Sequence, residues 1–361
     1  MPLNYDVKKL FRVTLNPMRG ENVLFLNDRP LDPSKVTADH KARDEMVQVW
    51  MAAMVELAKE RKFTVEPVLY YEVTSKDAAG WKGKAEQDGK PVALEAKLGA
   101  LTAKDIVLPV TAESITFELM RRQAAGQAFR VASAPGVRID QKGFEADFSK
   151  IPIRFKALAE RIQAADGVEV RFKGKDLQKT YKLFIDLRGV RYKYFENGHC
   201  HDPGRLINLP SGCANCIPYR GEAGDPRGKS LTKGHAPVVK DGKTALFTFK
   251  NGAVTDIAGD EAMVAEFKKA VFDPAAPDMK FLGKLGIGVN EACEYKEPHV
   301  EKEKAIGIHW GMGNAKKFFT VYAKENPVHV DLVFVYPDGT KETVMRDSKF
   351  AAKALGPAFK L

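Results

Sequence analysis

The first part of the chain alternates short apolar runs with segments whose apolar residues recur at helical spacing. Residues 22–28 predict a buried strand that ends in polar turn residues, residues 43–61 predict a helix, and residues 63–73 return to a strand pattern. The same order then repeats as a strand at 105–110, a helix at 114–125 and a strand at 129–133. Alternating strands and helices are typical of parallel strands joined by crossover helices. We therefore predict an N-terminal α/β open-sheet domain.

The pattern changes after a predicted helix at residues 155–165. The following segments alternate apolar and polar residues, as half-buried strands do, and only residues 260–271 add a helix. The predicted strands are 168–172, 181–187, 245–249, 253–257 and 330–336. We therefore predict two domains, an N-terminal α/β domain at 1–165 and a C-terminal β-rich mixed-sheet domain at 166–361.

Composition narrows the class of protein. The 361 residues are 44% hydrophobic and 29% charged, which is globular composition. The formal net charge is +10, but the lysines are dispersed among acidic residues, as in Lys302-Glu303-Lys304, so we expect no nucleic-acid partner. No stretch approaches the roughly 18 apolar residues of a membrane helix, and the first residues show no secretory signal. We expect a cytoplasmic protein with no membrane partner.

Three of the four cysteines, Cys200, Cys213 and Cys216, lie within one short segment. Four cysteines in a chain of this length are not a disulfide framework and fit a reducing compartment. A Cys-x-x-Cys motif serves metal binding or thiol chemistry, but Pro218 follows it at once, unlike the helix that follows a thioredoxin-like motif. Two interpretations stay open: unreactive cysteines buried in a loop, or metal ligands assisted by Cys200 or a neighbouring histidine such as His201.

Two histidine segments have the residue types of a metal site. In a strand, His329 and Asp331 point to the same face, and His309 lies among small residues that permit close backbone approach. Each alone is also consistent with an ordinary buried or surface histidine. Together, two histidines and one carboxylate suit a mononuclear iron oxygenase or, with a further ligand, a zinc hydrolase. The glycine-rich residues 283–288 lack the ending of a phosphate loop, and we interpret them as a turn packed near a site.

Several short segments follow one another in a distinctive order. They are Ala134-Pro135-Gly136-Val137, Gly174-Lys175-Asp176-Leu177, Asn208-Leu209-Pro210-Ser211-Gly212, Leu285-Gly286-Ile287-Gly288-Val289-Asn290, Glu303-Lys304-Ala305-Ile306-Gly307-Ile308-His309 and Val328-His329-Val330-Asp331-Leu332. In this order the segments resemble the thermophilic-type metallo-aminopeptidases, of the leucyl aminopeptidase and aminopeptidase T type, whose superfamily includes 2,5-dihydroxypyridine dioxygenase-like proteins. The resemblance extends over nearly the whole chain.

This resemblance implies a homodimer and a C-terminal domain in which five side chains bind two metal ions. Three of these positions carry over as His309, His329 and Asp331. The two glutamates of the family, after the Asn-Leu-Pro-x-Gly turn and before Leu-Gly-Ile-Gly, correspond to Cys213 and Lys284. Because an ammonium group cannot bridge two cations, the resemblance does not extend to an ordinary two-metal hydrolase.

We therefore predict a single zinc or iron ion bound by His309, His329, Asp331 and Cys213, with Cys216, Cys200 or His201 able to join or replace Cys213. In this hypothesis Lys284 occupies the space of the second metal as an electrostatic or proton-donating group. Tyr219, with Arg220, could orient an anionic substrate. The expected function is a metal-dependent enzyme of altered chemistry, acting on a peptide or small amino-acid-like substrate. The alternatives are an inactive peptide- or partner-binding relative, or an aminopeptidase whose glutamates are replaced by Glu222, Glu301 or Glu303.

Overall fold

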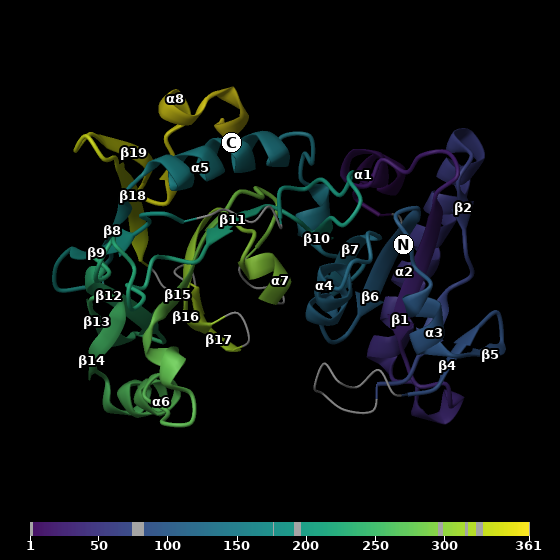
Figure 1. Cartoon of the computed structure of the whole chain (residues 1–361), viewed down its shortest axis with the longest axis horizontal. Coiled ribbons are helices and arrows are strands. Elements are labelled where there is room, and N and C mark those ends of the chain that lie inside the picture. The colour runs from purple at the N-terminus through teal and green to yellow at the C-terminus, as the bar shows by residue number, and fades with distance from the viewer. Residues whose placement is uncertain are drawn as a thin grey trace. The chain divides into compact units, whose positions relative to one another are not determined.

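The computed structural model describes residues 3–73, 83–175, 177–190, 196–294, 299–314, 317–322 and 328–360 (Figure 1). Asp176, within one segment that carries the resemblance, lies outside the described residues. The chain forms two compact units that interleave along the sequence. The first unit comprises Met1–Pro152, Phe195–Ser211 and Ala292–Glu301, and the second comprises Ile153–Tyr194, Gly212–Glu291 and Lys302–Leu361.

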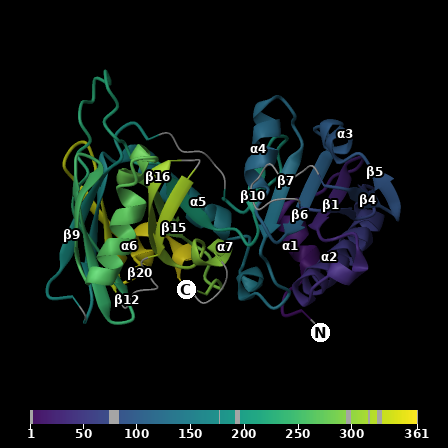
Figure 2. The same cartoon turned by 90° about the horizontal axis from the view of Figure 1, so that it is seen from below.

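The first unit is built on one sheet with helices on both faces. Its helices are α1 (Val7–Thr14), α2 (Ala38–Arg61), α3 (Leu94–Gly99) and α4 (Thr116–Ala124). Its strands are β1 (Asn22–Asp28), β2 (Thr64–Val65), β3 (Leu69–Tyr71), β4 (Ala85–Gln87), β5 (Lys90–Val92), β6 (Asp105–Thr111), β7 (Arg130–Pro135) and β10 (Leu206–Asn208). Figure 2 shows α1 and α2 on one side of this sheet and α3 and α4 on the other.

The strand order of this sheet is β10-β7-β6-β1-β3-β4-β5, with β2 paired to β1. The described pairs are parallel except for the β3–β4 and β4–β5 pairs at the edge, so the predicted α/β open sheet is confirmed. The chain leaves β1 through α2 toward β2 and β3, on one side of β1. It leaves β6 through α4 toward β7, on the opposite side. The strand order therefore reverses between β1 and β6.

Local sequence explains the first βα unit. In β1 every residue from Val23 to Asp28 is buried, as expected of a parallel strand covered on both faces. Helix α2 begins at Ala38, five residues before the predicted start, because Thr37 and His40 form a reciprocal capping box. The helix buries Trp50, whose ring packs edge-on against the ring of Phe11 at a centroid distance of 5.3 Å.

The second unit is mainly β-structure. Its helices are α5 (Ile151–Ala164), α6 (Glu261–Val271) and α8 (Ala352–Leu355), and the short α7 (His299–Lys302) ends at its boundary. Its strands are β8 (Gly167–Lys173), β9 (Tyr181–Asp186), β11 (Cys213–Cys216), β12 (Lys233–Lys240), β13 (Lys243–Lys250), β14 (Ala253–Gly259), β15 (Leu282–Gly288), β16 (Gly307–Asn314), β17 (Lys317–Tyr322), β18 (His329–Val335), β19 (Lys341–Arg346) and β20 (Lys349–Phe350). No helix in the described part of the chain is long and apolar enough to cross a membrane.

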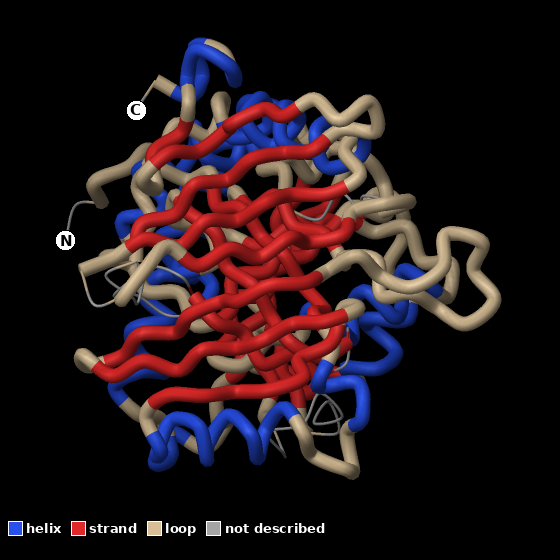
Figure 3. Tube along the Cα trace, turned by 90° about the vertical axis from the view of Figure 1, so that its left-hand side faces the viewer, coloured by secondary structure: helices blue, strands red, loops and turns tan. Residues whose placement is uncertain are grey.

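These strands form two sheets, one of order β14-β13-β12-β9-β8-β18-β19-β20 and one of order β11-β15-β16-β17. Figure 3 shows the strands of the larger sheet side by side. The β-rich prediction is confirmed, although the described strand pairs of this unit are antiparallel rather than mixed. Trp310 of β16 packs edge-on against Phe247 and Phe249 of β13, which joins the two sheets through an apolar core.

Helix α5 is placed differently from the predicted 1–165 domain, because from Ile153 onward it belongs to the second unit. Its side chains explain this. Arg161 forms a bidentate ion pair with Glu342 of β19, and the buried Arg154 donates to the carbonyls of Val289 and Ala358. These contacts hold the helix in the β-rich unit.

Candidate functional site

One face of the four-stranded sheet gathers three of the residues selected from the sequence. Cys213 of β11 is paired with Gly288 of β15, and Gly286 of β15 is paired with His309 of β16. Paired residues share a face, and alternate residues along a strand do too. Cys213, Lys284 and His309 therefore project from the same face, which also carries Gly286, Gly288 and Gly311.

Cys213 and His309 are in direct contact. The Cys213 Sγ atom lies 3.8 Å from His309 Nε2, and both residues are buried. Gly286 makes this contact possible, because a Cβ atom there would lie 2.0 Å from Nε2 of His309. The imidazole thus lies across the backbone of β15 to reach β11. Burial, followed by the nearby charge of Lys284, lowers the pKa of His309 to about 3, so its ring is neutral at neutral pH.

Lys284 is paired with a carboxylate beside this contact. Its Nζ atom lies 2.6 Å from Oε1 of Glu303, and Nζ of the buried Lys304 lies 3.3 Å from Oε2 of the same residue. Burial alone raises the pKa of Glu303, but the charges of Lys304 and Lys284 outweigh it and hold that pKa well below its ordinary value. The carboxylate is therefore ionised, and the three groups together carry one net positive charge.

Cys216 is separated from Cys213 by the geometry of β11. The Cys-x-x-Cys segment is a strand rather than a loop, and residues at i and i+3 of a strand lie on opposite faces. Cys216 pairs with Leu285, whose face also carries Ile287 and Trp310. Burial raises the pKa of Cys216 to about 12, so its thiol stays protonated. The two cysteines do not converge on one point.

Residues 283–288 form most of strand β15 and not the predicted turn, so their glycines have another role. At Gly288 a Cβ atom would lie 1.9 Å from the Ala305 carbonyl oxygen, and at Gly283 it would lie 2.1 Å from that of Gly313. The absence of side chains lets neighbouring backbone and the His309 ring approach the strand. The turn prediction is therefore wrong, whereas the close approach that motivated it is present.

His329 and Asp331 lie on β18, in the other sheet of the second unit. His329 is exposed at the start of the strand, where it pairs with Lys173. Asp331 is buried, and its carboxylate lies 2.6 Å from Nζ of Lys173 and accepts a hydrogen bond from the Asp347 N–H at 2.9 Å. Burial raises the pKa of Asp331, but these two contacts outweigh it and lower that pKa. The structure places Asp331 in an ion pair.

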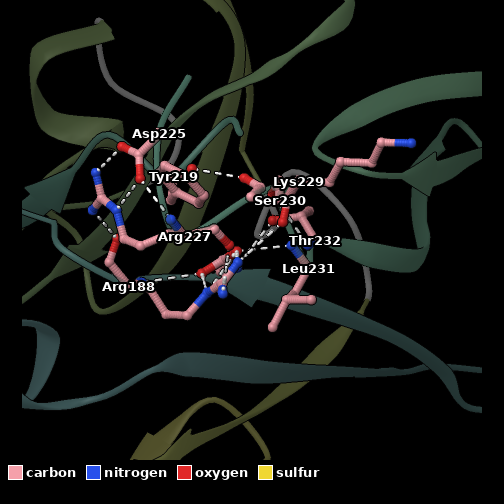
Figure 4. Close-up of polar contacts among 10 residues, drawn as sticks. Arg188, Tyr219, Asp225, Arg227, Lys229, Ser230, Leu231 and Thr232 are labelled. Atoms are coloured by element: carbon pink, nitrogen blue, oxygen red, sulfur yellow. Dashed lines mark hydrogen bonds and ion pairs between the residues drawn. The ribbon is translucent and has the colours of Figure 1, made fainter. Parts of the chain in front are cut away.

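Tyr219 lies in the loop after β11, where its N–H donates to the carbonyl of Asp186, the last residue of β9. Figure 4 shows Tyr219 among its polar neighbours. Its hydroxyl donates to the Gly228 carbonyl at 2.7 Å, and the guanidinium of Arg227 lies 4.3 Å from its ring centroid. Nearby, the fully buried Asp186 binds Arg188 and accepts the Leu231 N–H at 2.7 Å. The ring and hydroxyl of Tyr219 thus fix the loop. Its neighbour Arg220 donates to the Gly313 carbonyl at the end of β16.

Cys200 and His201 belong to the first unit. The buried thiol of Cys200 donates to the Val131 carbonyl at 3.3 Å, and burial raises its pKa to about 12. The ring of His201 stacks on His199 and its Nε2 atom lies 2.8 Å from the Val13 carbonyl oxygen. Both side chains have contacts within the parallel-sheet unit.

The structure therefore brings together Cys213, His309 and Lys284, and adds Glu303 and Lys304. Across the described ranges, no three side chains of the types His, Cys, Asp and Glu form a group that could hold a metal ion. The four-ligand set with His329 and Asp331 stays a prediction. Sequence reasoning named Glu303 only as a substitute ligand and missed its pairing with Lys284. The sequence feature that could have pointed to this pairing is Glu303-Lys304, an adjacent acidic and basic residue, with Glu303 six residues before His309.

The α/β fold is shared with two solved structures over nearly the whole chain. The structure of 2,5-dihydroxypyridine dioxygenase from Pseudomonas putida KT2440 matches with a TM-score of 0.55 at 14% identity, covering 96% of this chain and 97% of that chain. Wild-type AmpT from Thermus thermophilus matches with a TM-score of 0.52 at 12% identity, covering 96% and 98%. The resemblance inferred from the sequence is confirmed in the fold. No family model and no curated protein sequence matches the chain.

Proposed function

We propose that the Cys213–His309 face is the centre of a metal-dependent enzyme that uses one zinc or iron ion and acts on a peptide or small amino-acid-like substrate. The observation that carries the proposal is the 3.8 Å contact between Cys213 Sγ and His309 Nε2. It occurs in a chain whose structural relatives are metalloenzymes.

The separation of the two atoms supports a shared metal ion. A tetrahedral zinc ion with sulfur at about 2.3 Å and nitrogen at about 2.0–2.1 Å holds these two atoms about 3.5–3.6 Å apart. The observed distance of 3.8 Å between Cys213 Sγ and His309 Nε2 differs from this by a few tenths of an ångström. A thiolate and a neutral imidazole are good zinc and iron ligands. Such an ion would act as a Lewis acid toward a bound substrate.

The groups beside this pair suggest the kind of substrate. Lys284 and Lys304 carry two positive charges against one negative charge on Glu303. A net positive charge in a partly buried site attracts an anionic group such as the carboxylate of a peptide or amino acid. In this proposal, Lys284 binds and orients that carboxylate, while Glu303 holds the lysine in place. The sequence predicted an electrostatic or proton-donating role for Lys284 and gave the orienting of an anionic substrate to Tyr219 and Arg220, so binding of the substrate carboxylate by Lys284 is a new part of this proposal.

A second function, a peptide- or partner-binding protein without catalysis, is favoured by one observation. The Asp331 carboxylate forms an ion pair with Lys173 at 2.6 Å, whereas the single-metal hypothesis requires that carboxylate as a metal ligand. The third possibility, an aminopeptidase with substitute glutamates, has one carboxylate in position. Glu303 lies beside His309, whereas Glu301 is in the first unit, where it accepts the Gly143 N–H, and Glu222 is in the loop after β11.

Metal content tests the proposal directly. The chain is purified without added metal or chelator, and iron, zinc and other metals per chain are measured by inductively coupled plasma mass spectrometry. We expect close to one ion per chain in the wild type, and a loss of at least about tenfold in Cys213→Ala and His309→Ala, as removal of a supporting or direct ligand produces. Cys216→Ala is the matched control, because it removes the other thiol of the same strand from the opposite face.

The outcomes separate the three functions. No metal in the wild type, or equal metal in Cys213→Ala and wild type, excludes the single-metal centre and favours the binding protein. Two ions per chain favour the aminopeptidase. His329→Ala and Asp331→Asn complete the series, and a loss of metal in both variants would place the predicted four ligands around one ion. Circular dichroism of every variant checks that it is folded.

We also propose that the chain is a homodimer, on the resemblance alone. Light scattering coupled to size-exclusion chromatography gives the mass in solution, and a value near 40.0 kDa, the mass of one chain, would contradict a dimer.

A further inference from the structure

The first unit contains a pocket of about 360 Å³ at the place where the strand order of its sheet reverses. Asp28 and Arg29 line it from the carboxyl end of β1, and Ala112 and Glu113 line it from the carboxyl end of β6. In open α/β sheets, ligands bind outside the carboxyl ends of the strands at this reversal, because the diverging connections leave a crevice. The volume is in the range of small-molecule sites.

The floor of this pocket is a buried carboxylate that links the two strand ends. Both oxygens of Asp28 lie 2.8 Å from the Ala112 N–H nitrogen, and one accepts the Glu113 N–H at 3.3 Å. Arg43 of α2 lies 3.6 Å from the same carboxylate. Asp28 is thus fully engaged in holding β1, β6 and α2 together, and its charge is not available to a ligand.

Two further lining residues are held in place by neighbours outside the pocket. The Arg29 guanidinium pairs with Asp44 at 3.1 Å and lies 3.6 Å from the Tyr70 ring centroid. The Nδ1 atom of His40 accepts the Thr37 N–H at 3.1 Å in the capping box of α2. Because Nδ1 is an acceptor, the proton of the neutral ring is on Nε2, where it can be donated to a ligand.

The remaining charged lining residues are one cation, Lys35, and two anions, Glu72 and Glu113. Lys35 is largely exposed and is paired only loosely, at 3.7 Å, with Asp32. Among the described residues, the Glu113 carboxylate has no hydrogen-bond or ion-pair partner, whereas Glu72 accepts the Leu31 N–H. The apolar part of the lining is small, and comprises Pro30, Val73 and Ala112.

We propose that this pocket binds a small aliphatic zwitterion, a free amino acid or a dipeptide, at a site distinct from the Cys213–His309 face. Lys35 and the Nε2–H group of His40 bind the ligand carboxylate, and Glu113 binds the ligand ammonium group. Lys35, which is only loosely paired, and Glu113, which has no partner among the described residues, supply one charge of each sign for such a ligand. The short apolar lining matches a small aliphatic side chain.

Isothermal titration calorimetry of the full chain with L-valine tests this inference. Its two single-charge analogues, 3-methylbutanoate and isobutylamine, each lack one of the charged groups. We expect L-valine or L-alanyl-L-alanine to bind, and each analogue to bind at least about tenfold more weakly, since loss of one ion pair of about 1.4 kcal/mol is a factor of ten. No heat of binding from any probe up to about 10 mM, or equal affinity for valine and both analogues, would overturn the proposal.

Variants locate the binding. Lys35→Ala and Glu113→Gln should each weaken valine binding at least about tenfold, with loss of discrimination against isobutylamine in the first and against 3-methylbutanoate in the second. Lys41→Ala and Glu45→Gln, on exposed positions of α2 outside the lining, are the matched controls. Unchanged binding in both pocket variants refutes the site. The titration is repeated on Cys213→Ala, so that its result does not depend on the metal proposal.

Discussion

Replacing Gly286 with alanine tests whether the His309 ring lies across β15 as described. The new Cβ atom would lie 2.0 Å from Nε2 and 2.1 Å from Cε1 of the imidazole, distances that no packing tolerates. The ring must therefore rotate away or the strands must separate. Overpacking of this kind costs about 1–3 kcal/mol. Either response moves Nε2 away from Cys213 Sγ.

Native-state hydrogen exchange measured by mass spectrometry reports this locally. We expect the amide exchange of peptides from β15 and β16 to accelerate by about 5- to 140-fold in Gly286→Ala, which is the same 1–3 kcal/mol expressed as a ratio of rates. Peptides from β1 and β6 of the first unit serve as an internal reference. A second variant, Gly99→Ala, introduces the same methyl group where a Cβ atom has no heavy atom within 4 Å, and it should leave β15 and β16 unchanged.

The double variant Gly286→Ala/His309→Ala gives the decisive comparison. In the His309→Ala background the ring is gone, so the Cβ atom of alanine at position 286 no longer meets it. Gly286→Ala should then reduce stability by less than about 0.5 kcal/mol, which is the limit within which mutations at uncoupled sites add. If Gly286→Ala accelerates exchange equally in both backgrounds, the clash is with the backbone and the described position of the ring is refuted.

Three further predictions concern other parts of the chain. Burial raises the pKa of Asp28 to about 6, from an ordinary value near 4, so ionisation of Asp28 opposes folding. The stability that protonated Asp28 contributes is therefore fully present below about pH 4 and is lost as the pH rises through about 6. Urea titrations across this range should show this loss of unfolding free energy in the wild type and not in Asp28→Asn. Asp186→Asn leaves the Arg188 guanidinium without its buried partner and should cost about 3 kcal/mol, seen as faster proteolysis of the loop at residues 217–232, and an unchanged cleavage rate would contradict this. Tyr219→Phe removes one hydrogen bond to Gly228 and should cost about 1 kcal/mol of stability without changing metal content, whereas a loss of metal with stability unchanged would support the catalytic role inferred from sequence.

The parts of the fold that could be predicted from the sequence are those in which local pattern and tertiary environment agree. β1 and β6 are continuous apolar runs because both faces of a parallel sheet are covered, and the prediction of 22–28 coincides with β1. α6 was also predicted to within one residue, because Asp260 caps it and its buried residues Met263, Phe267 and Val271 recur at helical spacing.

β15 could not be predicted because the cause of its composition lies elsewhere in the chain. Glycine disfavours a strand intrinsically, so Leu282–Gly288 resembles a turn when taken alone. Its glycines are accounted for by the His309 ring and by the carbonyls of Ala305 and Gly313, none of which is a neighbour in sequence. The same limit applies to Lys284, whose partner Glu303 is 19 residues away.

Chain order also has a consequence for synthesis on the ribosome. The first unit needs Ala292–Glu301, and the second begins before residue 195 and needs the residues up to Leu361. An N-terminal domain usually folds while the rest of its chain is still being made. Here the complete first unit becomes available only after Glu301 has been added, when residues 153–194 and 212–291 of the second unit have already been made. The first unit therefore cannot fold completely before most of the second unit has been synthesised. A cut at residue 165 would release two incomplete fragments and a stop codon there would release one, each with exposed apolar surface that chaperones and proteases recognise.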